Sequence, residues 1–377
     1  MRRGACPSLA APMQTGDGLL ARLPPATMPP ADWVALARAA QQAGNGLLDI
    51  TARGSVQIRG LRAETLDLAE SLVPSDWPRG ALVMTSPLAG DAPDEVADPR
   101  PLARRIAAAA PLGLPPKATV LVDGGGALHL AGEAADLRLV AQPEGWLLGC
   151  GAAWLGLGDA EAALAAALLL LEAMAREDTR APSAVARAAA ARHLSPAPAP
   201  PAGTAPEALG LHALRDGLAL GVGLPFGRLE AATLIAFAEA SGARALRGAP
   251  GRVLLALGVP NPAGLRHKAA TLGLITQPDD ARGRVAACTG APACASALLD
   301  TRALAAMLAP LVPPGALLHV SGCAKGCAHP RPARLTLVGT PQGLGLIRRG
   351  RAGDTVAQHL HTQEARASLA REFAADA

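Results

Sequence analysis

Four cysteines in the C-terminal part constrain the fold of this chain more than any other feature. Cys288 and Cys294 stand in CTGAPAC, and Cys323 and Cys327 stand in SGCAKGCAHP. Each pair lies in a glycine-containing stretch, which predicts a loop rather than a helix or strand. If the four thiolates bind one inorganic centre, the fold must bring two separate loops together.

The spacing C-x5-C…C-x3-C favours a [4Fe–4S] cluster, because soft, negatively charged sulfur ligands bind iron and spread its charge. Gly290, Gly322 and Gly326 leave open backbone near the sulfurs, where amides can donate hydrogen bonds. Zinc is the second interpretation, since C-x3-C fits its usual ligand spacing but C-x5-C does not. Two structural disulfides are the third, and they would require an exported protein.

Charge and length narrow the class of protein. The chain has 377 residues, enough for two or three domains, and a net charge of +4. Without a run of Lys or Arg or an interleaved aromatic stripe, we expect no nucleic-acid partner and favour an anionic small ligand. The longest apolar run, 162–171, is too short to span a bilayer. We therefore expect no membrane partner and a reducing cytoplasm, in which Cys150 is a buried hydrophobe and Cys6 has no assigned role.

A weak internal repeat lies on the two sides of the Pro/Ala-rich run SPAPAPPAGTAPEA. In the first half, residues 16–25 and 44–61 flank a helical pattern over 31–43; in the second, 220–229 and 242–259 flank one over 230–241. Both halves predict a strand, a helix, a glycine turn and an arginine-bearing strand. This order predicts an α/β (α+β) fold with layers of ferredoxin-like type.

The repeat divides the chain into five expected segments. They are an N-terminal segment with a first half-domain (1–78), an α/β domain (79–180), a linker (181–210), a second half-domain (211–280) and a cysteine-bearing domain (281–377). Within them we expect two strands around a glycine turn in 117–131 and a hairpin in 335–348. We also expect helices over 159–177 and 363–375.

Basic residues gather in the stretch ITARGSVQIRGL. Arg53, Ser55, Gln57 and Arg59 alternate in sequence, so a strand would place them on one face. Two guanidiniums and an amide on one face suit carboxylate ligands, although a solvated strand face is an equally good interpretation. Further basic candidates for the same ligand are Arg79, Lys117, Arg247 and Arg252.

Two other polar residues stand close to the cysteines. His329 is a candidate ligand of a second iron or a proton donor, with a backbone hydrogen bond as the commoner role. Lys325 would offset cluster charge or face solvent. The stretch VDGGGALHL does not fit a dinucleotide-binding fingerprint. Any nicotinamide would therefore deliver electrons through a separate reductase or a brief encounter.

The cysteine spacing and the repeat resemble the nitrite/sulfite reductase superfamily over nearly the whole chain. Within it, several stretches are most similar to the precorrin-3B synthase family of aerobic cobalamin biosynthesis. These stretches are residues 2–23, 50–61, 86–95, 224–232 and 321–330. The resemblance implies a pseudo-two-fold repeat of ferredoxin-like half-domains with reductase-type iron–sulfur domains.

The same resemblance implies a chemistry. It implies a [4Fe–4S] cluster on Cys288, Cys294, Cys323 and Cys327, a mononuclear non-haem iron, and NADH as the electron source. The implied reaction is O2-dependent hydroxylation of the tetrapyrrole precorrin-3A at C20, with γ-lactone formation. A cleft lined by arginines would suit this polycarboxylated macrocycle. The catalytic residues and the ligands of the mononuclear iron are not identified by the sequence.

One departure from the superfamily pattern separates two functions. Arg53 and Arg79 fall where the reductases keep basic residues that meet the macrocycle or the anion. Lys117 matches the first lysine of the reductases' L-P-x-K-x-K, whereas Thr119 replaces the second. The missing lysine disfavours the alternative function, a sirohaem-dependent nitrite or sulfite reductase.

Overall fold

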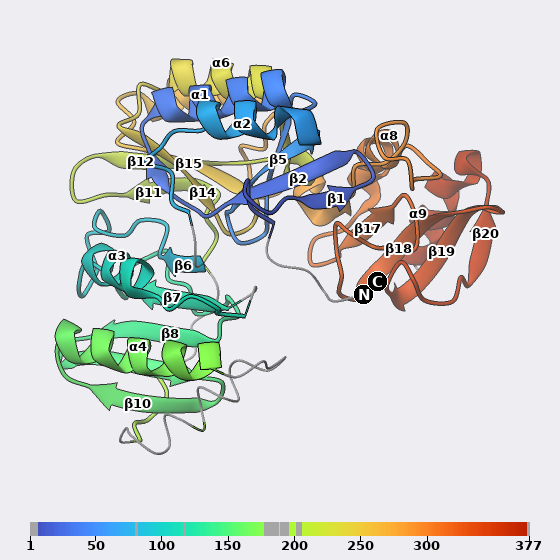
Figure 1. The fold of residues 1–377 in the computed structure, drawn as a ribbon. Helices are drawn as coiled ribbons and strands as arrows, with labels where there is room; N and C mark the ends of the chain where they lie inside the picture. Colours follow the sequence, from blue (N-terminus) through green and yellow to red (C-terminus); the bar gives the residue numbers. More distant parts are fainter. Residues whose placement is uncertain are drawn as a thin grey trace.

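The computed structural model describes residues 7–79, 82–115, 118–176, 188, 196–200 and 206–374. Within these ranges the chain forms four five-stranded sheets, with helices packed against them (Figure 1). Cys6, Lys117 and most of the segment 181–210 lie outside the described residues. None of the described helices is long and apolar enough to cross a membrane.

The first sheet is antiparallel and is built mainly from the N-terminal part of the chain. Its strands, in order across the sheet, are β1 (Met13–Thr15), β2 (Gly18–Leu23), β5 (Val56–Leu61), β4 (Leu47–Ile50) and β13 (Arg228–Glu230). Helices α1 (Pro30–Ala43) and α2 (Leu66–Leu72) belong to the same part of the chain. The edge strand β13 comes from the second half of the sequence.

The second sheet repeats this arrangement with residues from the second half. Its strands, in order, are β11 (Gly210–Ala213), β12 (Leu218–Gly223), β15 (Val253–Leu257), β14 (Ala245–Ala249) and β3 (Thr27–Met28). Helices α6 (Ala231–Ser241) and α7 (Pro262–Thr271) accompany it. Here the edge strand β3 comes from the first half, so each sheet borrows one short strand from the other half of the chain.

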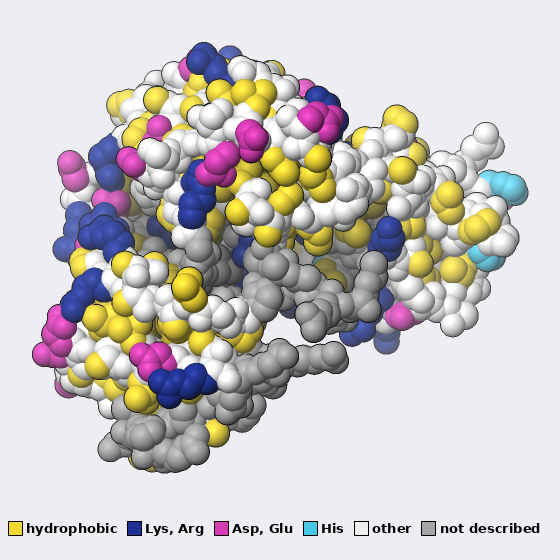
Figure 2. All heavy atoms as spheres, viewed as in Figure 1, with side chains coloured by type: hydrophobic (Ala, Val, Ile, Leu, Met, Phe, Trp, Pro, Cys, Tyr) yellow, Lys and Arg dark blue, Asp and Glu magenta, His cyan; other side chains and the backbone are white. Residues whose placement is uncertain are grey.

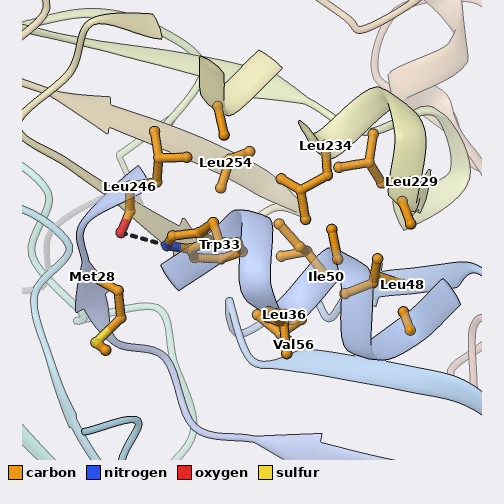
Figure 3. Packing of buried hydrophobic residues seen from close by; sticks show 14 of the residues in the cluster. Met28, Trp33, Leu36, Leu48, Ile50, Val56, Leu229, Leu234, Leu246 and Leu254 are labelled. Atoms are coloured by element: carbon orange, nitrogen blue, oxygen red, sulfur yellow. Dashed lines mark hydrogen bonds between the residues drawn. The ribbon is translucent and has the colours of Figure 1, made fainter. Parts of the chain in front are cut away.

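The two half-domains share one hydrophobic core, which lies between their sheets and the packed helices α1 and α6 (Figures 1 and 3). Trp33 on α1 is 1% exposed, and its indole Nε1 donates to the backbone carbonyl of Leu246 on β14 at 3.0 Å. Leu36 and Leu234, from the two helices, are buried in the same cluster. Burial of this common face ties the halves together, because apolar area removed from water is the main stabilising term.

The third and fourth sheets also repeat one another. The third contains β10 (Ala153–Leu157), β9 (Gly145–Cys150), β8 (Leu137–Gln142), β7 (Thr119–Asp123) and β6 (Leu82–Thr85), with α3 (Arg100–Ala109) and α4 (Ala160–Arg176). The fourth contains β16 (Val285–Ala287), β17 (Leu318–Ser321), β18 (Ala333–Thr340), β19 (Gly343–Gly350) and β20 (Gln358–Leu360), with α8 (Thr301–Leu308) and α9 (Ala365–Ala374). In each sheet, the first three strands in chain order pair in parallel, and each of the last two pairs antiparallel with the strand before it.

The predicted mixed α/β fold with a repeated ferredoxin-like half is confirmed, as are the helices expected over 31–43 and 230–241 and the hairpin in 335–348. The second strand expected in 117–131 was wrong. After β7 the chain turns, and the Asp123 carboxylate accepts hydrogen bonds from the backbone N–H groups of Gly125 and Leu130. This side chain therefore satisfies backbone donors that a strand partner would otherwise take.

Candidate functional site

A cavity of about 630 Å³ lies between the first sheet and the cysteine loops, and it is lined by residues far apart in the sequence. The N-terminal hairpin, the strands β4 and β5, the segment around β13 and both cysteine loops contribute to it. All four cysteines, Cys288, Cys294, Cys323 and Cys327, line this cavity, and none forms a disulfide. A volume of this order suits a sizeable small-molecule ligand.

The parallel pairing of β16 and β17 explains why the two cysteine loops meet. Cys288 directly follows β16, and Cys323 lies two residues after β17. Because neighbouring parallel strands end at the same edge of a sheet, the loops leave the sheet side by side. The loops are also bonded to each other, since the backbone N–H of Leu298 donates to the carbonyl of Gly322 at 2.8 Å.

Glycine allows close approach at the cysteines. The Gly322 backbone N–H donates to Cys288 Sγ at 3.2 Å, the kind of contact that backbone amides make with metal-binding sulfurs. A Cβ placed on Gly16, in the hairpin between β1 and β2, would lie 2.2 Å from Cys294 Sγ. The same glycine accepts a hydrogen bond from the Ala295 backbone N–H at 2.9 Å. The N-terminal hairpin therefore packs directly on the first cysteine loop.

The surroundings of Cys327 disfavour its thiolate form. Loss of hydration in the cavity raises the pKa of the Cys327 thiol, and the neighbouring thiols of Cys288, Cys323 and Cys294 raise it further. Lys325 opposes this shift, and its ammonium donates to the Ser296 hydroxyl at 3.0 Å. A cationic centre at this position would favour the thiolate form of Cys327.

A network of two arginines and two aspartates joins the first sheet to the cysteine loop. Arg59 on β5 pairs with Asp17 and, at 3.3 Å, with Asp49 on β4. Arg228 on β13 binds the other side of Asp49 at 2.7 Å. The Thr289 hydroxyl, next to Cys288, accepts from Arg59 at 3.2 Å and from Arg228 at 2.9 Å. Both arginines thus fix the loop that carries Cys288.

Asp17 remains ionised in this network. Burial would raise the pKa of this carboxyl, but the hydrogen bond and charge of Arg59 lower it below its ordinary value. Its side chain is only 2% exposed, so the Asp17–Arg59 pair is a structural contact rather than a solvated one.

On the face of the molecule shown in Figure 2, Lys and Arg side chains are interspersed with Asp and Glu side chains.

Three of the predicted substrate-binding residues line the cavity: Gln57, Arg59 and Arg252. Gln57 and Arg59 share a face of β5, as the alternation predicts. The predicted strand face does not extend to Arg53 and Ser55, because β5 begins at Val56 and the chain turns over 51–54.

Three other predicted substrate-binding residues lie outside the cavity lining, and Lys117 is not among the described residues. Arg53 pairs with Glu133 at 3.6 Å, outside the cavity lining. Arg79 pairs with Glu70 at 3.1 Å on the surface, and Arg247 is buried with its guanidinium bonded to Thr27 and Thr85.

Two histidines pack beside the second cysteine loop. The rings of His319 and His329 meet edge to face, with centroids 5.8 Å apart. His319 is fully buried, and burial, followed by His329 and Arg252, lowers its pKa to about 4. Neither ring nitrogen of His319 has a hydrogen-bond partner among the described residues. The described residues also contain no group of three or more His, Cys, Asp and Glu side chains that could hold a single metal ion.

Sequence reasoning missed several residues of the cavity wall, namely Asp17, Asp49, Thr289, Arg228 and Arg302. Asp17, Asp49 and Thr289 lie within the internal repeat or the first cysteine stretch, but each has an arginine partner from a strand that is distant in sequence. Arg228 lies in LPFGRLEAA, a stretch that carries the family resemblance but is not a basic cluster. Arg302 follows the second cysteine closely enough that proximity to the loop was a usable signal.

Known proteins resemble this chain in sequence and in fold. A sequence family described as the nitrite/sulfite reductase ferredoxin-like half domain matches residues 11–72. The structure of the Mycobacterium tuberculosis NirA protein superimposes with a TM-score of 0.71 at 19% identity, covering 94% of this chain and 80% of that one. This likeness establishes the fold. A precorrin-3B synthase from Sinorhizobium sp is 39% identical over 408 residues, covering 98% of this chain and 88% of that protein.

Proposed function

The chain belongs to the precorrin-3B synthase family, and from this premise we propose that it is an O2-dependent monooxygenase acting on precorrin-3A in aerobic cobalamin biosynthesis. One oxygen atom of O2 hydroxylates C20, and the ring-A acetate closes a γ-lactone onto C1. The second oxygen atom leaves as water, with two electrons that come from NADH. The proposal places this chemistry in a reducing cytoplasm, where unpaired thiols persist.

The observation that carries the proposal is the shared cavity. Four thiols and several guanidiniums face one space of about 630 Å³. Such a space offers both a redox centre and cations for a polycarboxylated ring. A site for a small uncharged substrate would have no need of this concentration of arginine.

We assign the four cysteines to a [4Fe–4S] cluster, and the residues present fit that group. Gly322 already donates to Cys288 Sγ, and Gly16 has no side chain where Cys294 Sγ lies. When bound, the cluster supplies electrons one at a time. The residues that would hold a mononuclear iron are not identified among the described residues, so we assign it no ligands.

The chain's own residues have binding and positioning roles in this proposal. Arg59 and Arg228 hold Thr289, and through it they fix the backbone next to Cys288. The N-terminal hairpin packs against Cys294, and Gly16 leaves room for that sulfur. Gln57, on the same strand face as Arg59, presents an amide to the cavity for a carbonyl or carboxylate of the substrate.

The test is anaerobic reconstitution with iron and sulfide, followed by reaction of precorrin-3A with 18O2 and a reductant. We expect a product one oxygen atom heavier than the substrate, carrying a single labelled atom, and no reaction without O2. Unchanged precorrin-3A under these conditions would refute the proposed reaction. Metal analysis on the same sample separates iron and sulfide from zinc.

The alternative function, a sirohaem-dependent nitrite or sulfite reductase, predicts a different result. Such an enzyme would bind sirohaem tightly and turn over nitrite or sulfite anaerobically with reduced methyl viologen. We expect no sirohaem absorption bands and no such turnover. The electron donor that couples NADH to this enzyme is proposed to be a separate reductase, because the sequence has no dinucleotide-binding fingerprint.

A further inference from the structure

The positive charge of the cavity is not evenly available to a ligand. Arg59 and Arg228 are neutralised by Asp17 and Asp49. Arg302, by contrast, has no carboxylate within ion-pair distance among the described residues, and neither does Arg252, although both line the same cavity. Together with Lys325, whose ammonium donates to the neutral Ser296 hydroxyl, these two guanidiniums carry the cavity charge that is left to an anionic ligand.

Arg302 is held in place but incompletely bonded. Its guanidinium lies over the ring of Phe226, 5.7 Å from the centroid, where cation and ring attract each other. Its Nε is buried and has no hydrogen-bond partner in the described part of the chain. Burial, together with the nearby charge of Arg228, lowers the pKa of Arg302 to about 10. The side chain thus stays protonated at neutral pH, but its environment disfavours the unpaired charge.

Arg252 packs against the short turn that contains Phe226. Its guanidinium donates to the Ala328 carbonyl at 3.0 Å, next to Cys327. Its stem crosses Gly227 so closely that a Cβ on this glycine would lie 2.6 Å from Arg252 Cδ. This contact explains why glycine follows Phe226 at the turn η2 (Pro225–Gly227).

The backbone is strained in the turn η2 and at Arg252, which packs against this turn. Phe226 has φ 58° and Arg252 has φ 64°, two of the three left-handed non-glycine residues found in the described chain. Such conformations cost free energy and persist where the surrounding structure fixes them, often at ligand sites. Phe226 contacts the Arg302 guanidinium, and Arg252 carries the second guanidinium of the cavity that lacks a carboxylate partner among the described residues.

We propose that Arg302 and Arg252 bind carboxylates on the rim of the ligand and together form its main anion-binding site in the cavity. This rests on the proposed function, because the ligand is taken to be a polycarboxylated tetrapyrrole. Each guanidinium provides planar paired donors that match a carboxylate. Arg59, which the sequence suggested for this role, instead fixes the cysteine loop.

The test is equilibrium binding under anaerobic conditions, with precorrin-3A and with uroporphyrin III as a stable octacarboxylate probe. Arg302→Gln and Arg252→Gln should each raise the dissociation constant about 10- to 100-fold, the loss expected for one charge-assisted pair. Arg302→Lys should recover part of the affinity, because it restores charge but not the planar fork. The difference from wild type should shrink as salt is raised.

Arg244→Gln is the matched control, since Arg244 is exposed and pairs with Asp91 at 2.8 Å away from the cavity. Iron content and the thermal unfolding midpoint establish that each variant is folded. If both glutamine variants bind as tightly as wild type, the inference is overturned while the proposed function stands. If the wild type binds neither tetrapyrrole, both are overturned.

Discussion

The third and fourth sheets share strand order and pairing, yet the loops after their first two parallel strands differ in chemistry. In the fourth sheet, the loops after β16 and β17 carry four cysteines and open into the cavity. In the third sheet, the loops after β6 and β7 are fastened to each other. Asp94 accepts from the Ala127 backbone N–H at 3.1 Å, and the Val96 N–H donates to the Gly124 carbonyl at 2.8 Å.

This difference shows that, in a repeated scaffold, a new site arises in the loops that follow the parallel strands. The parallel strands fix the edge from which the loops leave, and the residues of the loops decide whether that edge binds a ligand or only itself. Carboxylates satisfy backbone N–H groups and help to join the loops of the third sheet. The loops of the fourth sheet are joined by backbone hydrogen bonds, and their four thiols line the cavity.

The largest effect is expected at a loop cysteine. Cys323→Ser should abolish cluster assembly and turnover, because a serine hydroxyl is a poor replacement for a soft thiolate. Iron and sulfide content and the cluster absorbance measure the outcome. Cys150→Ala is the control from the third sheet, since Cys150 is fully buried in the core beneath α4. Equal losses in the two variants would contradict the assignment.

A smaller effect should follow from a change in the N-terminal hairpin. In Gly16→Ala the new methyl group would overlap Cys294 Sγ, so either the thiol or the hairpin must shift. We expect reduced iron content after reconstitution and a cluster that is lost faster in air. Gly283→Ala is the matched control, because a Cβ there meets no atom within 4 Å. Full cluster content in Gly16→Ala would show that the hairpin does not shape the site.

In the third sheet, the corresponding prediction concerns pH. Burial raises the pKa of Glu95 to about 7 from 4.5, despite a hydrogen bond from the Gly90 N–H at 2.7 Å. The folded protein therefore retains a proton that the unfolded chain has lost between these pH values, and the contribution of Glu95 to stability falls as pH rises through this window. Glu95→Gln should remove this dependence and raise the free energy of unfolding above pH 7 by roughly 1–3 kcal/mol.

Chemical denaturation of wild type and Glu95→Gln at several pH values between 4 and 8 measures this effect. The difference between the two proteins isolates Glu95 from other groups that titrate in the range. Parallel pH profiles would mean that the Glu95 carboxyl is ionised in the folded protein across this range. The contacts between the loops after β6 and β7 would then not depend on its proton.

The smallest effect is expected at Arg53. Its pair with Glu133 is partly exposed, with 38% of the arginine side chain accessible, and such pairs contribute under about 1 kcal/mol. Arg53→Ala should therefore change tetrapyrrole affinity little, in contrast to Arg302→Gln. A large rise in the dissociation constant for Arg53→Ala would show that Arg53 contacts the substrate. It would also contradict the different roles given to Arg53 and Arg302.

The sequence predicts elements better than it predicts partners. Alternation placed Gln57 and Arg59 on one face of a strand, and the cysteine spacing anticipated two loops that share a cavity. The pairing of Arg59 with Asp17 and Asp49 could not be predicted, because it depends on which strands become neighbours. Likewise, no strand forms after β7 and its glycine turn, because the Asp123 side chain accepts hydrogen bonds from the backbone there. Hydrophobic periodicity contains no information on such a side-chain contact.

The exchange of β3 and β13 between the first two sheets has a consequence for any attempt to divide the molecule. A fragment ending before residue 181 would carry β3 without its partner and leave β4 as an open edge, which invites aggregation. We expect the two halves to be recovered in usable form only when they are produced together, each completing the other as a strand donor. Gene fission at the Pro/Ala-rich segment would then yield an obligate two-chain complex rather than two independent proteins.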